Sequence, residues 1–150
     1  MRKEFEDLLI SRYPKIFRKN FGFECDDGWV NIIDGACHLI QSHINNQRGQ
    51  KARALRRVRS GEPLRQWDHE WLEKTPCPQL VIVQVKEKFG TLRLYHDGGD
   101  SYVFGVVDAA ENMSSFTCEV CGNLGTMNSS GWIKCLCETH REERNKRYER

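Results

Sequence analysis

The chain has 150 residues and a formal net charge of +2, and 39% of its residues are hydrophobic and 29% charged. This length suits one hydrophobic core and is too short for two full ones. No stretch approaches the roughly 18 consecutive apolar residues of a bilayer span, and the N-terminal MRKEFED carries acidic residues where a signal peptide needs an apolar run. We therefore expect a cytoplasmic protein that does not contact a membrane.

Seven cysteines are the most informative feature of the composition. An odd number does not suit a disulfide framework, and four of the seven fall between positions 118 and 137. Thiols of a protein that is not exported stay reduced. The cysteine pattern therefore favours a metal site.

Helical periodicity predicts three helices in the N-terminal third. Two are short, with Pro14 ending the first and opening the second, and their apolar residues are Phe5, Leu8, Leu9, Ile16 and Phe17. The third follows a capping segment at Asp26-Asp27-Gly28 and carries an apolar stripe from Trp29 to Ile44. Cys37 lies on that stripe and is interpreted as a core residue.

The segment from Asn45 to Pro78 is polar, basic and weakly periodic. No acidic residue occurs between Asp34 and Glu62, whereas six basic residues do: Arg48, Lys51, Arg53, Arg56, Arg57 and Arg59. We expect residues 47–78 to form a mobile basic insertion with a short helix. Arg53, Arg56 and Arg57 are its candidate contacts to nucleic acid.

Two tryptophans, Trp67 and Trp71, stand one helical turn apart in this insertion. Exposed tryptophans are common anchors at protein interfaces. The alternative interpretation is that the pair covers the core, and the sequence does not separate the two.

A β-hairpin is predicted from the runs 79–89 and 91–96, with Phe89-Gly90 as a two-residue turn. This turn places Lys88 opposite Thr91, Lys86 opposite Arg93 and Gln84 opposite Tyr95. One face is then apolar, with Val81, Val83, Val85, Leu92 and Leu94, and the other is polar, with Gln84, Lys86, Lys88, Arg93 and Tyr95.

Like charges directly across a ladder repel each other, so something negative is expected between Lys86 and Arg93. An internal carboxylate, Glu111 or Asp108, is one candidate. A bound phosphate, with Tyr95 stacking on a base, is the other. Residues 96–101 are predicted to form a turn and helix cap, and the helix that follows, from Tyr102 to Met113, would supply the carboxylate.

The C-terminal third contains a metal-binding pattern, C-x2-C-x15-C-x2-H, formed by Cys118, Cys121, Cys137 and His140. Four soft or borderline ligands suit a closed tetrahedral zinc site with a structural role. Cys135 is an alternative fourth ligand, ranked second because Cys137 and His140 have the i, i+3 spacing that converges on a helix. A knuckle, a strand with Trp132 and a final helix through Arg147 resemble a treble clef.

Known catalytic patterns do not fit. HNH-type nucleases need a further histidine between the ligand pairs, and residues 122–136 contain none. Zinc deaminases need an upstream H-x-E and a proline before the first cysteine, where this chain has Thr117. The P-loop, dinucleotide and H-E-x-x-H patterns are absent. A site of scattered residues would use Asp108, Glu111, Lys86 and Arg93, but we expect a protein that is not an enzyme.

Several segments together resemble a family of uncharacterised small zinc-knuckle proteins of bacteriophages and prophages. They are Asp27-Gly28-Trp29, the run from Gln84 to Tyr95, Ala110-Glu111, the C-E-V-C-G run, Gly131-Trp132 and Cys137-Glu-Thr-His140. The resemblance implies a phage-type accessory protein of the host cytoplasm that binds a host protein, a nucleic acid or a nucleotide.

The sequence thus predicts an α+β fold in which amphipathic helices pack on a β-hairpin and a treble-clef-like zinc knuckle follows. Residues 1–116 would form the core, with the insertion at 47–78, and residues 117–150 the knuckle and last helix, integrated into one domain. The predicted function is binding of a phosphate-bearing partner, nucleic acid or nucleotide. The alternative is a module that binds and inhibits or redirects a host protein.

Overall fold

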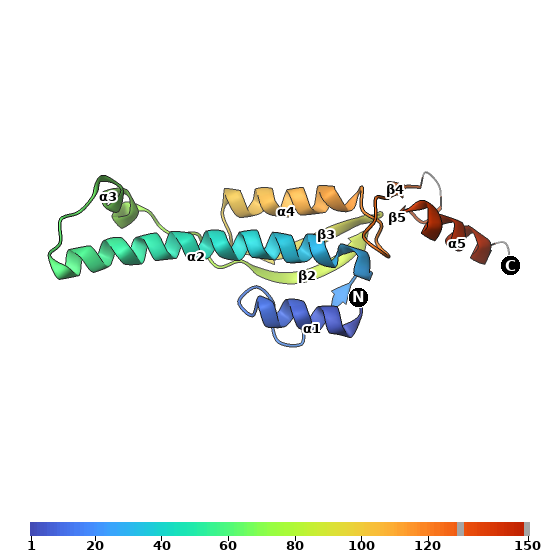
Figure 1. The fold of residues 1–150 in the computed structure, drawn as a ribbon, viewed down its shortest axis with the longest axis horizontal. Coiled ribbons are helices and arrows are strands. Elements are labelled where there is room, and N and C mark those ends of the chain that lie inside the picture. Colours follow the sequence, from blue (N-terminus) through green and yellow to red (C-terminus); the bar gives the residue numbers. More distant parts are fainter. Residues whose placement is uncertain (129–130, 149–150) are drawn as a thin grey trace.

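The computed structural model describes residues 1–128 and 131–148, and over these residues the fold is mixed α and β, as predicted (Figure 1). The elements in chain order are α1 (Lys3–Arg12), β1 (Phe23–Glu24), the 3-10 turn η1 (Asp27–Trp29), α2 (Val30–Ser60), α3 (Gln66–Glu73), β2 (Val81–Lys88), β3 (Thr91–Asp97), α4 (Ser101–Ser114), β4 (Thr126–Met127), β5 (Cys135–Leu136) and α5 (Glu138–Tyr148).

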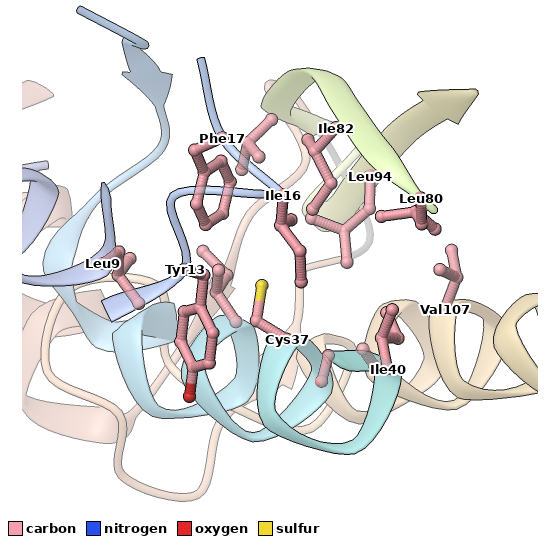
Figure 2. Close-up of a cluster of buried hydrophobic side chains, with 14 of the residues drawn as sticks. Leu9, Tyr13, Ile16, Phe17, Cys37, Ile40, Leu80, Ile82, Leu94 and Val107 are labelled. Carbon is pink, nitrogen blue, oxygen red and sulfur yellow. The ribbon is translucent and has the colours of Figure 1, made fainter. Parts of the chain in front are cut away.

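A three-stranded sheet with the order β1-β2-β3 carries the core. β2 and β3 are antiparallel, and the short β1 pairs in parallel with β2. α2 and α4 run side by side across the sheet (Figure 1). In Figure 2 the α2 residues Cys37 and Ile40 and the α4 residue Val107 meet Ile82 and Leu94 of the sheet, and all five side chains are buried. The prediction that Cys37 is a core residue is confirmed.

The N-terminal region departs from the predicted pair of helices. α1 forms, but the second predicted helix is only a hydrogen-bonded turn, closed by a 3.1 Å bond from the Phe17 amide to the Tyr13 carbonyl. The chain leaves the helical path because the carbonyl of Ile16 accepts a 2.9 Å hydrogen bond from the amide of Ile82. Phe17 then packs against Phe23 with 5.1 Å between ring centroids.

α2 is longer than predicted, with 31 residues from Val30 to Ser60 and a length of about 47 Å. It ends at Gly61, whose φ of 67° gives the left-handed cap common at helix ends. The expected aspartate cap at its start is wrong, because Asp27 instead accepts a 2.7 Å hydrogen bond from the backbone amide of Arg2. None of the described helices, α2 included, is long and apolar enough to cross a membrane.

Residues 47–78 were expected to form a mobile insertion with a short helix. They instead contain the second half of α2 and the whole of α3. The second half of α2 projects beyond the sheet, and α3 lies beside its far end (Figure 1). The ammonium group of Lys51 donates hydrogen bonds of 2.6 and 3.0 Å to the carbonyls of Leu72 and Lys74 at the end of α3. A cation at a helix C-terminus also complements the helix dipole.

The predicted hairpin register is confirmed: Lys88 pairs with Thr91, Lys86 with Arg93 and Gln84 with Tyr95. Phe89 and Gly90 have φ values of 53° and 78°, as a two-residue turn of this twist requires. The predicted apolar face is wrong at its start, because a β-bulge lies between Ile82 and Gln84. The bulge buries Ile82 completely and leaves Val83 45% exposed.

α4 begins as predicted. The carboxylate of Asp100 accepts a 3.2 Å hydrogen bond from the amide of Val103, which satisfies one of the free N–H groups of the first turn.

Candidate metal centre

The four predicted metal ligands come together at one end of the molecule. Their ligand atoms all lie within 4.8 Å of one another. Cys118 and Cys121 lie on the turn after α4, Cys137 follows β5, and His140 lies in the first turn of α5. The predicted Cys118, Cys121, Cys137 and His140 set thus forms a cluster that could hold a metal ion.

The distances within the cluster fit a tetrahedral ion. Two sulfur ligands at about 2.3 Å from such an ion lie about 3.8 Å apart, and a sulfur and an imidazole nitrogen about 3.6 Å apart. The sulfurs of Cys121 and Cys137 are separated by 3.8 Å. Nδ1 of His140 lies 3.5 Å from the sulfur of Cys118 and 3.1 Å from that of Cys137. Nδ1 is therefore the nitrogen that would coordinate a metal.

The surrounding backbone favours the thiolate form of Cys118. Burial opposes ionisation of this thiol, but backbone amides of Cys137, Cys121 and Val120 donate to the sulfur, and together they lower its pKa to about 7. A thiolate is the form that coordinates a metal. Two of these amides belong to the turn after α4 and the third precedes α5, so the backbone fold itself favours the thiolate at Cys118.

Cys135, the alternative ligand, lies outside the cluster. It is fully buried, and its sulfur donates to the carbonyl of Ser115 at 3.2 Å. Burial, followed by the nearby Cys118, raises the pKa of Cys135 to about 11. Cys135 packs behind the knuckle, where Gly125 leaves room for its sulfur, since a Cβ at Gly125 would stand 2.9 Å from it.

Two residues before α2 join the knuckle to the core. The indole nitrogen of the fully buried Trp29 donates a 2.9 Å hydrogen bond to the carbonyl of Thr117. Gly28 lies against the knuckle backbone, since a Cβ at this position would stand 2.1 Å from the carbonyl oxygen of Cys118. Only glycine fits there, which explains the Gly-Trp pair at 28 and 29.

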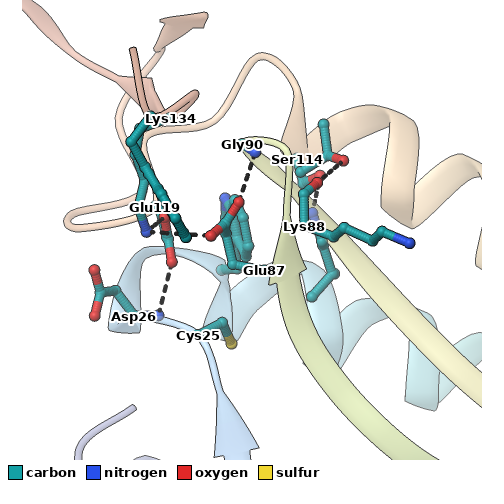
Figure 3. Close-up of polar contacts among 12 residues, drawn as sticks. Cys25, Asp26, Glu87, Lys88, Gly90, Ser114, Glu119 and Lys134 are labelled. Atoms are coloured by element: carbon teal, nitrogen blue, oxygen red, sulfur yellow. Dashed lines mark hydrogen bonds and ion pairs between the residues drawn. The ribbon is translucent and has the colours of Figure 1, made fainter.

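A buried ion pair lies beneath the knuckle (Figure 3). The side chain of Glu119 is 2% exposed, and its carboxylate lies 2.5 Å from the ammonium group of Lys134. Glu87 of the hairpin lies 3.7 Å from the same ammonium group and also accepts a 2.6 Å hydrogen bond from the amide of Gly90. The pair thus links the knuckle to the hairpin turn.

Burial and pairing act in opposite directions on these two groups. Burial raises the pKa of Glu119, with Lys134 opposing this effect. Burial lowers the pKa of Lys134, but the hydrogen bond to Glu119 outweighs it and the net pKa is raised. The short contact therefore outweighs the effect of burial on Lys134 and opposes it only in part on Glu119. Sequence reasoning missed this pair, because a glutamate between two metal-binding cysteines carries no pattern that marks it as buried.

On the polar face of the hairpin, Arg93 forms an ion pair with an internal carboxylate. Its guanidinium lies 3.5 Å from Glu111, whose carboxylate also accepts a 2.9 Å hydrogen bond from the amide of Leu94. The ammonium group of Lys86 lies over the ring of Tyr95, 5.0 Å from its centroid. Of the two carboxylates predicted near Lys86 and Arg93, Glu111 is the one that pairs with Arg93, and Asp108 is exposed.

The predicted arginines of the insertion have different surroundings. Arg57 is paired, 3.3 Å from Glu62 and 3.5 Å from the buried Asp68. Arg53 and Arg56 are exposed on α2, and no carboxylate within the described ranges contacts either of them. They lie at the opposite end of the molecule from the hairpin turn, so the structure does not unite the two predicted anion-binding groups (Figure 1).

The two predicted interaction tryptophans differ in burial. Trp67 is 52% exposed, with the guanidinium of Arg65 4.9 Å from its ring centroid. Trp71 is half-buried on the same helix, with the ammonium group of Lys74 4.8 Å from its ring centroid. Trp67 therefore does not cover the core.

A cleft of about 920 Å³ lies beside the metal cluster, between the N-terminus, the knuckle and α5. It contains both acidic and basic side chains. The main ones are paired with each other, Arg2 with Asp27 and Lys134 with Glu119. The charges of these four side chains therefore offset one another within the cleft.

We compared the chain with protein-family models, with curated proteins and with solved structures, and it matches none of them.

Proposed function

We propose that the Cys3His cluster is a structural zinc centre of a treble-clef-like knuckle. The donor set of three sulfurs and one nitrogen is one that zinc favours, and four protein ligands leave no position for a catalytic water. The order of knuckle, β4/β5 hairpin and α5 helix supports the treble-clef comparison. Zinc would tie the turn after α4 to the start of α5.

We further propose that the protein is a non-enzymatic, phage-type accessory protein that binds nucleic acid through the second half of α2. One observation carries this proposal: an exposed helical face with four arginines and no acid. We call it the arginine face, and it consists of Arg48, Arg53, Arg56 and Arg59.

The helical repeat explains how this face is organised. The buried residues Gln47 and Ala54 lie on the side of α2 that faces α3 and the segment before β2, so the four arginines lie on the other side. Arg48, at the edge of this side, also donates a 3.4 Å hydrogen bond to the side chain of Gln79. Gly49 and Ala52 lie between these arginines, and no long side chain projects from the helix at these two positions. No carboxylate in the described chain pairs with the arginine face.

A nucleic acid suits such a surface. Residues 45–60 of α2 span about 24 Å, and the major groove of duplex DNA admits an α-helix. Arginines on a helix contact phosphates on both sides of a groove without requiring a particular sequence. The second half of α2 projects beyond the sheet, and α3 lies beside its far end (Figure 1).

Binding of labelled duplex DNA and RNA as a function of salt tests this proposal. The slope of log K against log salt is negative, and each lost phosphate contact reduces its magnitude by about 0.9. The triple variant Arg53→Gln, Arg56→Gln, Arg59→Gln is expected to reduce that magnitude by about two to three and to weaken binding at least tenfold. The variant Lys15→Gln, Arg18→Gln, Lys19→Gln, which removes three exposed charges elsewhere, is the control. Equal losses in both variants, or no binding by the wild type, would contradict the proposal.

The exposure of Trp67 favours a second candidate, a module that docks α3 on a host protein. Such a complex depends on an aromatic anchor, so Trp67→Ala would weaken it strongly while salt would not. Capture from bacterial lysate with and without nuclease distinguishes the two. A protein that is captured after nuclease treatment and lost with Trp67→Ala supports the second candidate.

A further inference from the structure

A second cluster of metal-ligand side chains lies away from the Cys3His centre. Its three residues are His43 in the middle of α2, Cys77 in the segment before β2, and Asp100 at the start of α4. Their ligand atoms all lie within 4.8 Å of one another. Nε2 of His43 lies 2.9 Å from a carboxylate oxygen of Asp100.

The side-chain nitrogen of Gln47 crowds the contact between His43 and Asp100. Nε2 of His43 lies 2.9 Å from Asp100 and 2.8 Å from the side-chain nitrogen of Gln47. If Nε2 carries a proton, it donates to Asp100 but faces the amide N–H groups of Gln47. If Nε2 carries no proton, it accepts from Gln47 but its lone pair faces the carboxylate.

Rotating the Gln47 amide only moves the conflict. Its oxygen accepts a 2.9 Å hydrogen bond from the backbone amide of Cys77, so the reversed amide would place two donors together there. A cation bound by the Nε2 lone pair and the Asp100 carboxylate is an alternative arrangement, in which both atoms face positive charge. In either arrangement the side-chain nitrogen of Gln47, 3.3 Å from that carboxylate, donates to it.

The three side chains are held in place by further contacts. The sulfur of Cys77 donates a 3.3 Å hydrogen bond to the carbonyl of Pro78, which a bound metal would replace. The other carboxylate oxygen of Asp100 caps α4 through the amide of Val103. The ring of His43 stacks on Tyr102 with 4.2 Å between centroids. Cys77 lies between two prolines and is 3% exposed. Ligands fixed in this way need little reordering to bind an ion.

We propose that His43, Cys77 and Asp100 bind a second divalent transition-metal ion, with zinc as its best match. One nitrogen, one sulfur and one oxygen are donors that zinc accepts, and three protein ligands leave a fourth position open. The side chains of His43 and Asp100 are 20% and 32% exposed, so an external ligand can reach that position. This site is independent of the arginine face and of the Cys3His centre.

Metal analysis of the full chain after saturation with zinc and gel filtration tests the proposal. Wild type is expected to hold two zinc ions, and Cys77→Ala and Asp100→Asn one each. Asparagine keeps the helix cap but loses the carboxylate charge, so Asp100→Asn is expected to stay folded. His43→Ala is likewise expected to hold one ion. His38→Ala, at an exposed histidine of the same helix, is its control and is expected to keep both.

Cobalt provides a second measurement. In a Cys118→Ser background, Co²⁺ is expected to give a thiolate charge-transfer band from Cys77, and Cys77→Ala removes it. One zinc in the wild type, or two zinc ions retained in both Cys77→Ala and Asp100→Asn, overturns the second site. Either result leaves the nucleic-acid proposal untouched, since that depends on the arginine face alone.

Discussion

The backbone amide of Gly28 donates a 2.7 Å hydrogen bond to the carbonyl of Glu119, the residue after the first cysteine of the metal cluster. The turn that begins α2 and the knuckle that would hold zinc are therefore in direct backbone contact. Loss of structure at either one is expected to reach the other.

Replacement of Gly28 by alanine tests this contact. The added Cβ would stand 2.1 Å from the carbonyl oxygen of Cys118 and 2.5 Å from that of Glu119, and backbone atoms cannot move away cheaply. Gly28→Ala is expected to lower the free energy of unfolding by about 3 kcal/mol or more, the cost of severe overpacking. Chemical denaturation measures this change.

The control for Gly28→Ala is Gly49→Ala. Gly49 lies inside α2, and nothing stands within 4 Å of a Cβ added there. Alanine in a helix interior stabilises by about 0.5–1 kcal/mol relative to glycine. If both variants behave alike, the contact between Gly28 and the knuckle has no energetic role.

The pair between Lys134 and Glu119 makes a second prediction. Lys134→Met leaves the carboxylate of Glu119, 2% exposed, without its cation. The expected cost is about 2–3 kcal/mol in unfolding free energy, somewhat below that of fully buried pairs because Lys134 is 24% exposed. Adding Glu119→Gln to Lys134→Met should recover part of the loss in a double-mutant cycle. Additive losses would show that the two residues are not coupled.

Local patterns predicted much of the fold. Cysteine spacing located the metal cluster, and the Phe89-Gly90 turn fixed the hairpin register, because a two-residue loop allows only one pairing. The bulge at Val83 escaped prediction, since strict alternation assigned Val83 and not Ile82 to the core. The bulge breaks this alternation, so Ile82 packs in the core and Val83 faces outward.

The length of α2 was missed for a different reason. Its apolar stripe ends at Ile44, and beyond that point only Gln47 and Ala54 are buried, so hydrophobic periodicity fades while the helix continues. Arginine, lysine, glutamine and alanine are strong helix formers, and that preference outweighs the weak pattern. Contacts between residues distant in sequence, such as Glu119 with Lys134, leave no local signal.

The hairpin residues Lys86 and Arg93 are expected to serve stability and not binding. Because Arg93 pairs with Glu111 and Lys86 lies over Tyr95, the double variant Lys86→Ala, Arg93→Ala should lose about 0.5–1 kcal/mol of unfolding free energy. Its affinity for nucleic acid should change less than twofold. A large loss of affinity without loss of stability would instead support a phosphate site on the hairpin.

The attachment of α3 is expected to depend on pH. A side-chain hydrogen bond from Arg65, then a backbone hydrogen bond from the same residue, lower the pKa of Asp68. A carboxyl with a lowered pKa in the folded state stabilises the fold above its unfolded pKa of about 4, and loses this contribution as the pH falls through the folded value.

Comparison of wild type with Asp68→Asn isolates this effect, because any loss of zinc in acid is common to both. Wild type should be the more stable at pH values above about 5 and the difference should disappear in acid. A difference that stays constant with pH would mean that the charge of Asp68 does not stabilise the fold.

Zinc content after ligand replacement tests the metal centre, the central claim, most directly. Cys118→Ser and Cys137→Ser are each expected to hold one zinc ion fewer than the wild type, since a structural site does not persist half-filled. Cys135→Ser should hold the same number as the wild type, because that sulfur bonds to Ser115 and lies outside the cluster. Unchanged zinc in both ligand variants, or loss of zinc in Cys135→Ser, would contradict the assignment of the four ligands.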